Sequence, residues 1–333
     1  MSGFLLSAFA VARKTIRPVT GANNHRISLF VVGRKMSTSS DYYTIGITGS
    51  GGLVGTALID ELGRREQLFE KPIRIVRLTR GDHAETKMLP SQFQTTLTWN
   101  PHGSTADDII SPQAASEIDS IVHLSGENVS TNIGLGPLNV LGIRPWTQRK
   151  KDEIIHSRVS TTAALSKVVA ASDKPKTFLS ASGVGVYGDR FIGDTAPPAA
   201  DESTDTSNVP GFLAHVSREW EAATDLAKNN DKQHRVVILR NAVVMSKQGG
   251  ALQKLYPIFL LGGGGRIGGG RQYFTFISAR DLARAFVYCL ETPSLEGPVN
   301  MCAPIPCTNL EFTKAMGSVL HRPTILPLPS FAV

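Results

Sequence analysis

Cysteine is scarce in this chain of 333 residues, which contains three, Cys289, Cys302 and Cys307. An odd, small number of thiols excludes a disulfide framework and is typical of a reducing compartment. The three have neither CxxC spacing nor a nearby histidine, which disfavours a metal site and favours buried thiols. Apolar runs of about 18 or more residues are also missing, so we expect no membrane span.

Acidic residues are absent from the first 40 positions, which contain six basic ones, Arg13, Lys14, Arg17, Arg26, Arg34 and Lys35. An acid-free, Ser/Thr-rich head predicts a targeting presequence over 1–41 and a mitochondrial (matrix) protein. The alternatives are a secretory signal built on "FLLSAFAVA", a disordered tail, or a true start at Met36, which would give a cytoplasmic protein. Apart from these six, the chain contains 29 basic and 28 acidic residues. The rest of the protein is therefore nearly neutral and has no excess of positive charge for nucleic-acid binding.

Apolar strands and amphipathic helices alternate along the rest of the chain. Short apolar runs predict strands at 43–48, 73–78, 95–99, 119–125, 177–182 and 235–240, and periodic segments predict helices at 51–65, 147–171 and 212–229. Near-continuous apolar strands separated by helices are typical of a parallel sheet covered on both faces. The pattern therefore predicts an α/β fold with a doubly wound parallel sheet.

The stretch "ITGSGGLVG" (47–55) joins the first predicted strand to the first predicted helix. In such a turn Gly49 permits the tight bend, Gly52 the close approach of a ligand, and Gly55 the packing of helix on strand. Backbone N–H groups at the helix start, around Leu53 and Val54, then face a pyrophosphate. No GK[ST] follows, which excludes a phosphate-only P-loop. The motif predicts dinucleotide binding rather than a merely tight turn.

The end of the second strand, "VRLTRGD", has no acid where NAD-binding proteins hold the ribose 2′-hydroxyl. Arg80 stands there instead, and the planar fork of arginine suits a 2′-phosphate. Arg77 lies within the strand and is the weaker candidate. Asp82 could still serve a 2′-hydroxyl, and Arg80 could be a solvated loop residue. We predict NADP(H) as the cofactor in preference to NAD(H).

Five stretches carry a family resemblance: "ITGSGGLVG", "IVHLSGENV", "RPWTQRKKDEIIHSRVSTT", "SASGVGVYGD" and "GGGGRIGGGRQYFTFISARDLARAF". Together they resemble the extended short-chain dehydrogenase/reductase superfamily, in particular the nucleoside-diphosphate-sugar-epimerase-like branch known as epimerase family proteins. The resemblance implies a Rossmann-type NAD(P)-binding domain over 42–333. It also implies a smaller C-terminal substrate lobe built from about 186–212, 241–276 and 299–333. It names no substrate, and we expect relatives to continue beyond "ILPLPSFAV".

The resemblance also assigns roles to individual residues. It implies a cofactor groove lined by Leu124, Ser125 and Gly126 and extended toward the nicotinamide by Glu127 and Asn128. For Glu127 and Asn128, loop capping is the open alternative. Ser182 matches the family's catalytic Ser/Thr, counted from its strand. The substrate side is implied to include Trp146, Lys150, Arg158, Arg271 and Gln272. Trp146 could instead pack a helix start, and Lys150 could be solvated.

The superfamily's acid–base pair, a Tyr with a Lys four residues later, is missing. A helix places that pair on one face, where the ammonium lowers the pKa of the phenol. None of the six tyrosines has a lysine at that spacing, and Gly211 and His215 occupy the two positions. Tyr187 and His215 are candidate substitutes, unless Tyr187 packs the pocket wall and His215 lies on the helix surface. We expect an NADP(H)-dependent oxidoreductase or epimerase whose small-molecule substrate is unknown. The alternative is a non-catalytic NADPH-binding protein. The sequence leaves open whether the protein forms a homodimer.

Overall fold

The computed structural model describes residues 41–65, 67–81, 94–129, 147–188, 199–228 and 232–327. The predicted presequence lies outside the described residues apart from Asp41, and Asp82 and Trp146 lie outside them too. No helix within these ranges combines the length and the apolarity that a membrane span needs.

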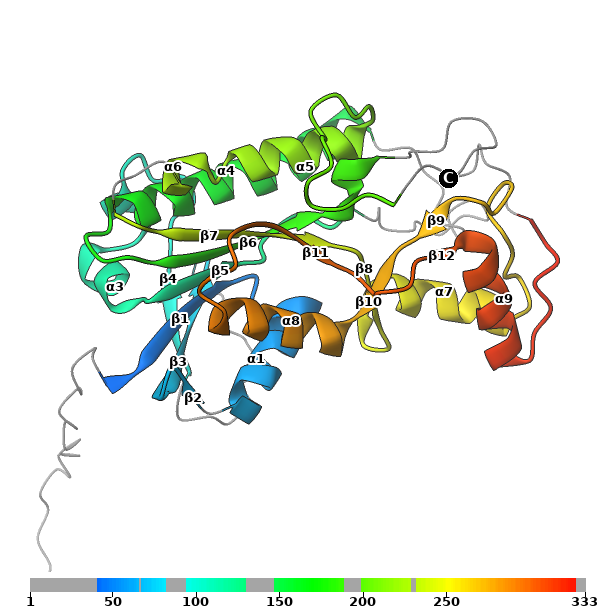
Figure 1. The fold of residues 1–333 in the computed structure, drawn as a ribbon, viewed down its shortest axis with the longest axis horizontal. Helices are drawn as coiled ribbons and strands as arrows, with labels where there is room; N and C mark the ends of the chain where they lie inside the picture. The colour runs from blue at the N-terminus through cyan, green and yellow to red at the C-terminus, as the bar shows by residue number, and fades with distance from the viewer. Residues whose placement is uncertain are drawn as a thin grey trace, which may run out of the picture. The chain divides into compact units, whose positions relative to one another are not determined.

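A sheet of eight strands forms the centre of the described chain (Figure 1). Seven of them are parallel, in the order β4-β3-β1-β5-β6-β7-β11, while β2 pairs antiparallel with the start of β3. Numbered by chain position, the parallel strands read 3-2-1-4-5-6-7, the Rossmann order with one strand added. The predicted doubly wound fold is confirmed. The strands are β1 (Tyr43–Thr48), β2 (Gln67–Leu68), β3 (Lys71–Thr79), β4 (Gln94–Thr98), β5 (Ser120–His123), β6 (Thr177–Gly183), β7 (Arg235–Asn241) and β11 (Gly297–Met301).

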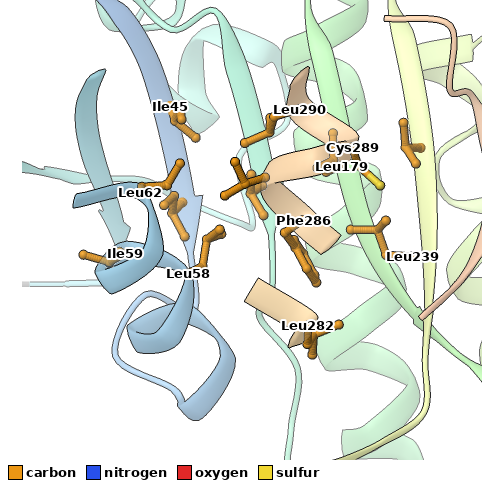
Figure 2. Packing of buried hydrophobic residues seen from close by; sticks show 14 of the residues in the cluster. Ile45, Leu58, Ile59, Leu62, Leu179, Leu239, Leu282, Phe286, Cys289 and Leu290 are labelled. Carbon is orange, nitrogen blue, oxygen red and sulfur yellow. The ribbon is translucent and has the colours of Figure 1, made fainter. Parts of the chain in front are cut away.

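Helices cover both faces of this sheet (Figure 1). On one face α1 and α8 lie side by side, and their Leu58 and Phe286 pack among buried strand residues such as Leu239 (Figure 2). The opposite face carries α4, α5 and α6 over a second core that includes Leu165 and Phe178. The helices are α1 (Leu53–Arg65), α2 (Ala106–Ile109), α3 (Pro112–Glu117), α4 (Gln148–Ala171), α5 (Phe212–Ala222), α6 (Asp225–Lys228) and α8 (Ala279–Glu291).

Two small sheets and two helices follow β7 in the chain. β8 pairs parallel with β10, and β9 pairs antiparallel with β12. Phe274 and Phe276 before α8 cluster with Phe312 of α9, which ties these segments together. The boundaries of the substrate lobe stay a prediction. The elements are β8 (Val243–Ser246), α7 (Gly250–Leu260), β9 (Tyr273–Phe274), β10 (Phe276–Ser278), β12 (Cys307–Thr308) and α9 (Asn309–Leu320).

Two predicted elements differ from the observed ones. The strand predicted to reach residue 125 ends at His123, because the N–H of Leu124 donates to the Thr48 hydroxyl instead of to a strand. The helix predicted over 212–229 is divided into α5 and α6. At Thr224 the N–H and the hydroxyl both donate to the carbonyl of Glu221, at 3.1 and 2.7 Å, which closes a tight turn and ends α5.

Candidate functional site

The glycine turn between β1 and α1 leaves no room for side chains at two positions. Gly49 has φ +63°, and a Cβ there would lie 2.8 Å from the carbonyl carbon of Leu124 and 3.0 Å from the nitrogen of Ser125. A Cβ at Gly55 would lie 2.4 Å from the carbonyl oxygen of Gly49. Gly52 closes the turn by donating its N–H to that oxygen (3.0 Å), and it is exposed just before α1. The turn thus presents bare backbone at an open helix N-terminus.

A buried histidine fastens this turn to the next strand. The Thr161 hydroxyl of α4 donates to the carbonyl of Ser157 (2.7 Å), so it accepts from His123 Nε2 (3.1 Å), which carries the ring hydrogen. His123 Nδ1 therefore accepts from the Thr48 hydroxyl (2.7 Å), which itself accepts from the N–H of Leu124 (3.1 Å). Burial lowers the pKa of His123 to about 3, so the ring is neutral. The carboxyl ends of β1 and β5 are therefore held together by uncharged hydrogen bonds.

Arg80 follows Thr79, the last residue of β3, and it is exposed. Arg77 differs: it is buried in the strand, its Nε donates to Gln94 Oε1 at 2.8 Å, and burial lowers its pKa. An exposed guanidinium at the carboxyl end of the strand beside β1 can reach a phosphate on a bound nucleotide. The geometry leaves Arg80 open to a ligand and Arg77 engaged within the sheet.

The segment after β5 meets the start of α4. The backbone N–H of Glu127 donates to the Ser157 hydroxyl (2.9 Å), and its carboxylate pairs with the ammonium of Lys150. Lys150 holds the pKa of Glu127 below its ordinary value. The side chain of Arg158 lies against Gly126, where an added Cβ would be 3.2 Å from Cζ. The structure thus brings together two predicted cofactor residues and two predicted substrate residues.

A row of polar side chains crosses the carboxyl ends of β6, β7 and β11, where the strand register aligns Ser182, Arg240 and Asn300. Ser182 donates to Glu221 of α5 (2.8 Å), and Arg240 holds the same carboxylate with Nε and Nη2, both at 2.9 Å. Nη1 of Arg240 also donates to the Tyr187 hydroxyl (2.8 Å), which donates to Asn300 (2.9 Å). Each side chain in this row thus has a hydrogen-bond partner within the described residues.

The two positions of the missing relay lie at the start of α5. Gly211 has φ +105° and precedes the helix, so no side chain is available there. His215 is 52% exposed at its side chain, with Nδ1 3.9 Å from Glu219 on the same helix. Of the α5 residues, Glu221 is the carboxylate that reaches the strand ends.

The remaining predicted substrate residues lie before β9. The side chain of Gln272 donates from Nε2 to the backbone carbonyl of Ile267 (3.0 Å). The backbone carbonyl of Gln272 accepts from the N–H of Asn309 (2.8 Å). Arg271 is exposed beside it. The contacts of Gln272 thus join the loop between α7 and β9 to the start of α9, and a substrate role for both residues stays a prediction.

Comparison with known proteins decides the family, although no family model matches the chain. An epimerase family protein of Mycobacterium leprae is 36% identical over 298 residues, which are 90% of this chain and 84% of that protein. The chain belongs to the epimerase family. The resemblance in the sequence motifs is thereby confirmed.

Two solved structures extend this assignment. The human epimerase family protein, solved with NADPH, is 27% identical with a TM-score of 0.61, over 86% of this chain and 83% of that one. A nucleoside-diphosphate sugar epimerase from Corynebacterium glutamicum is 28% identical with a TM-score of 0.60, over 86% of this chain and 53% of that one. This epimerase family member therefore shares its Rossmann-type fold with both.

Proposed function

We propose that the protein binds NADP(H) across the carboxyl ends of β1, β3 and β5. The observation that carries this is the glycine turn, because a Cβ at Gly49 or Gly55 would collide with backbone atoms. Such a turn at an open helix N-terminus fits a pyrophosphate, whose oxygens accept from backbone N–H groups. The human relative solved with NADPH supports the choice of ligand. The cofactor, when bound, supplies or accepts a hydride.

We propose further that Arg80 selects NADP(H) over NAD(H). Its exposed guanidinium follows β3 directly, and a charge-assisted hydrogen bond to a phosphate contributes about 1.5–3 kcal/mol. Isothermal titration calorimetry should show tighter binding of NADPH than of NADH. Arg80→Met should weaken NADPH binding by about 10- to 150-fold and leave NADH binding unchanged. Arg284→Met, at a half-exposed arginine on α8, is the matched control. Equal affinities of the unmodified protein for the two cofactors would contradict the assignment.

The proposed chemistry is an oxidoreductase or epimerase reaction on a small molecule, with an unconventional proton donor. Ser182 already donates to Glu221, and the Tyr187 hydroxyl already donates to Asn300. His215 lies on the exposed side of α5. General acid–base catalysis contributes about 10²–10⁴-fold, so we expect slow reduction of ordinary carbonyl compounds. These same contacts favour the second candidate function, an NADPH-binding protein without turnover.

Single-turnover oxidation of NADPH with panels of carbonyl compounds and sugar nucleotides separates the two functions. If turnover exists, Ser182→Ala, Tyr187→Phe and His215→Ala should be compared. Loss of the chemical step in one variant, with NADPH affinity retained, identifies the proton donor. Fast turnover that survives all three changes would contradict the proposed roles, and no turnover beside tight NADPH binding would favour the binding protein.

We also propose that residues 1–40 direct the protein to mitochondria, on the basis of six basic residues without an acid. A fluorescent protein fused to this segment should enter the organelle. The same fusion with all six basic residues changed to glutamine should stay in the cytosol. A diffuse signal from the unmodified fusion would exclude import.

A further inference from the structure

Arg158 is a half-buried cation with few hydrogen bonds. Of the five N–H donors of its guanidinium, the structure pairs one, Nη1, with the carbonyl of Ile154 (3.1 Å) within the described part of the chain. The guanidinium lies over the Trp220 ring, with Cζ 5.0 Å from the centroid. Burial lowers the pKa of Arg158 to about 10, which still leaves it charged at neutral pH. None of its other donors is among the buried atoms that lack a partner in the described residues, so these donors reach solvent and are open to an acceptor on a ligand.

Arg158 also occupies the edge of the sheet where a ligand would bind. Its Cζ and Nη2 would lie 3.2 and 3.4 Å from a Cβ on Gly126, so the guanidinium rests on bare backbone at the end of β5. Ser125, one residue earlier, adjoins Gly49 of the glycine turn. Ligands of open parallel sheets bind outside the carboxyl ends of the strands. The unpaired donors are thus next to the proposed cofactor cradle.

The local charge is positive. The carboxylate of Glu127 interacts electrostatically with Arg158, but its ion pair is with Lys150. The closest histidine in the core, His123, is neutral. Two cations, Lys150 and Arg158, therefore share one carboxylate, which leaves one positive charge uncompensated.

We propose that Arg158 binds an oxyanion, a carboxylate or a phosphate, on the small-molecule substrate. The planar fork of arginine holds two oxygens of such a group at once. Lys150 neutralises Glu127, which leaves the charge of Arg158 available to the ligand, and Gly126 keeps the approach free of a side chain. This inference rests on the proposed function, because it places the substrate beside bound NADP(H).

The test uses the full-length protein saturated with NADPH and titrated with acetate or inorganic phosphate by calorimetry. Trp220 provides a local signal, since an anion drawn to Arg158 changes the surroundings of the indole ring and hence its fluorescence. Arg158→Met keeps the side-chain stem and removes the charge. It should weaken anion binding by about tenfold or more while NADPH affinity stays within about twofold. Tighter binding of acetate identifies a carboxylate substrate, and tighter binding of phosphate a phosphorylated one.

Arg149→Met is the matched control, because Arg149 lies on the same helix and its side chain is 89% exposed. It should bind both anions as the unmodified protein does. If Arg158→Met lowers the melting temperature, Arg158→Lys is tested in its place. Lysine keeps the positive charge but lacks the planar fork of the guanidinium, so this variant should still bind phosphate more weakly. The proposal is overturned if neither anion binds, if the Arg158 variants bind anions normally, or if NADPH displaces the anions. Failure of the unmodified protein to bind NADPH would instead refute the proposed function.

Discussion

Replacing Gly49 by alanine should destabilise the protein and open the nucleotide cradle. The residue has φ +63°, and the new methyl group would lie 2.8 Å from the carbonyl carbon of Leu124 and 2.9 Å from its oxygen. A left-handed conformation costs a residue with a Cβ about 1–2 kcal/mol. Overpacking costs about 1–3 kcal/mol more, and the contacts here are with backbone, which yields little. We expect a loss of about 2–5 kcal/mol in the free energy of unfolding.

Gly51 in the same turn is the matched control. A Cβ there meets no atom within 4 Å, and its φ lies outside the left-handed region. Urea denaturation should therefore show Gly51→Ala within about 0.5 kcal/mol of the unmodified protein. Calorimetry should show that Gly49→Ala loses at least about tenfold in NADPH affinity, because the strand ends must separate. Equal stability of the two alanine variants would refute the reasoning from close contact.

Three further outcomes follow from buried charges and hydrogen bonds. His123 has a pKa of 6.5 when unfolded and about 3 when folded, so the unfolded chain binds more protons between these values. Stability should fall by about 2.5 kcal/mol from about pH 7 to 4.5, and His123→Gln should flatten that part of the profile. Glu221→Gln should cost about 3–5 kcal/mol in urea denaturation, because it leaves the Arg240 charge buried; a loss below about 1 kcal/mol would show the pair to be dispensable. Arg235 donates to the carbonyls of four residues at the end of α8 and beyond, so Arg235→Met should lower stability by about 2–3 kcal/mol. An unchanged melting temperature would disprove that capping role.

The tight glycine turn could be predicted from sequence because such a turn requires a particular residue type. A backbone that must bend tightly and approach a ligand needs glycine, and the contacts at Gly49 and Gly55 show why. Arg80 could be placed at a strand end because the run "IRIVRL", which is rich in apolar residues, ends shortly before it. The family resemblance reinforced these inferences through motifs of the same kind, and the comparisons then confirmed it.

The polar row over β6, β7 and β11 could not be predicted. Glu221 and Arg240 are 19 residues apart, and Tyr187 and Asn300 are 113 apart. Their contacts depend on strand register and on the turn that ends α5, neither of which a single sequence displays. A polar residue inside the apolar run "RVVILRN" was the available signal for Arg240. The number of unpaired donors on Arg158 is likewise visible only when its neighbours are in place.

The bond from Tyr187 to Asn300 has a consequence for biosynthesis. Asn300 lies on β11, the last strand of the main sheet to leave the ribosome. At about 5–20 residues per second, the 113 residues between the partners take about 6–23 s to translate. During that interval β1, β3 and β5 are complete, while the growing sheet has an open edge, first at β6 and then at β7 once residue 241 has been added. An open edge of this kind can pair with other chains. The nascent protein therefore passes through a stage that can already hold a dinucleotide and is most exposed to aggregation, so cofactor supply during translation should raise the yield of folded protein.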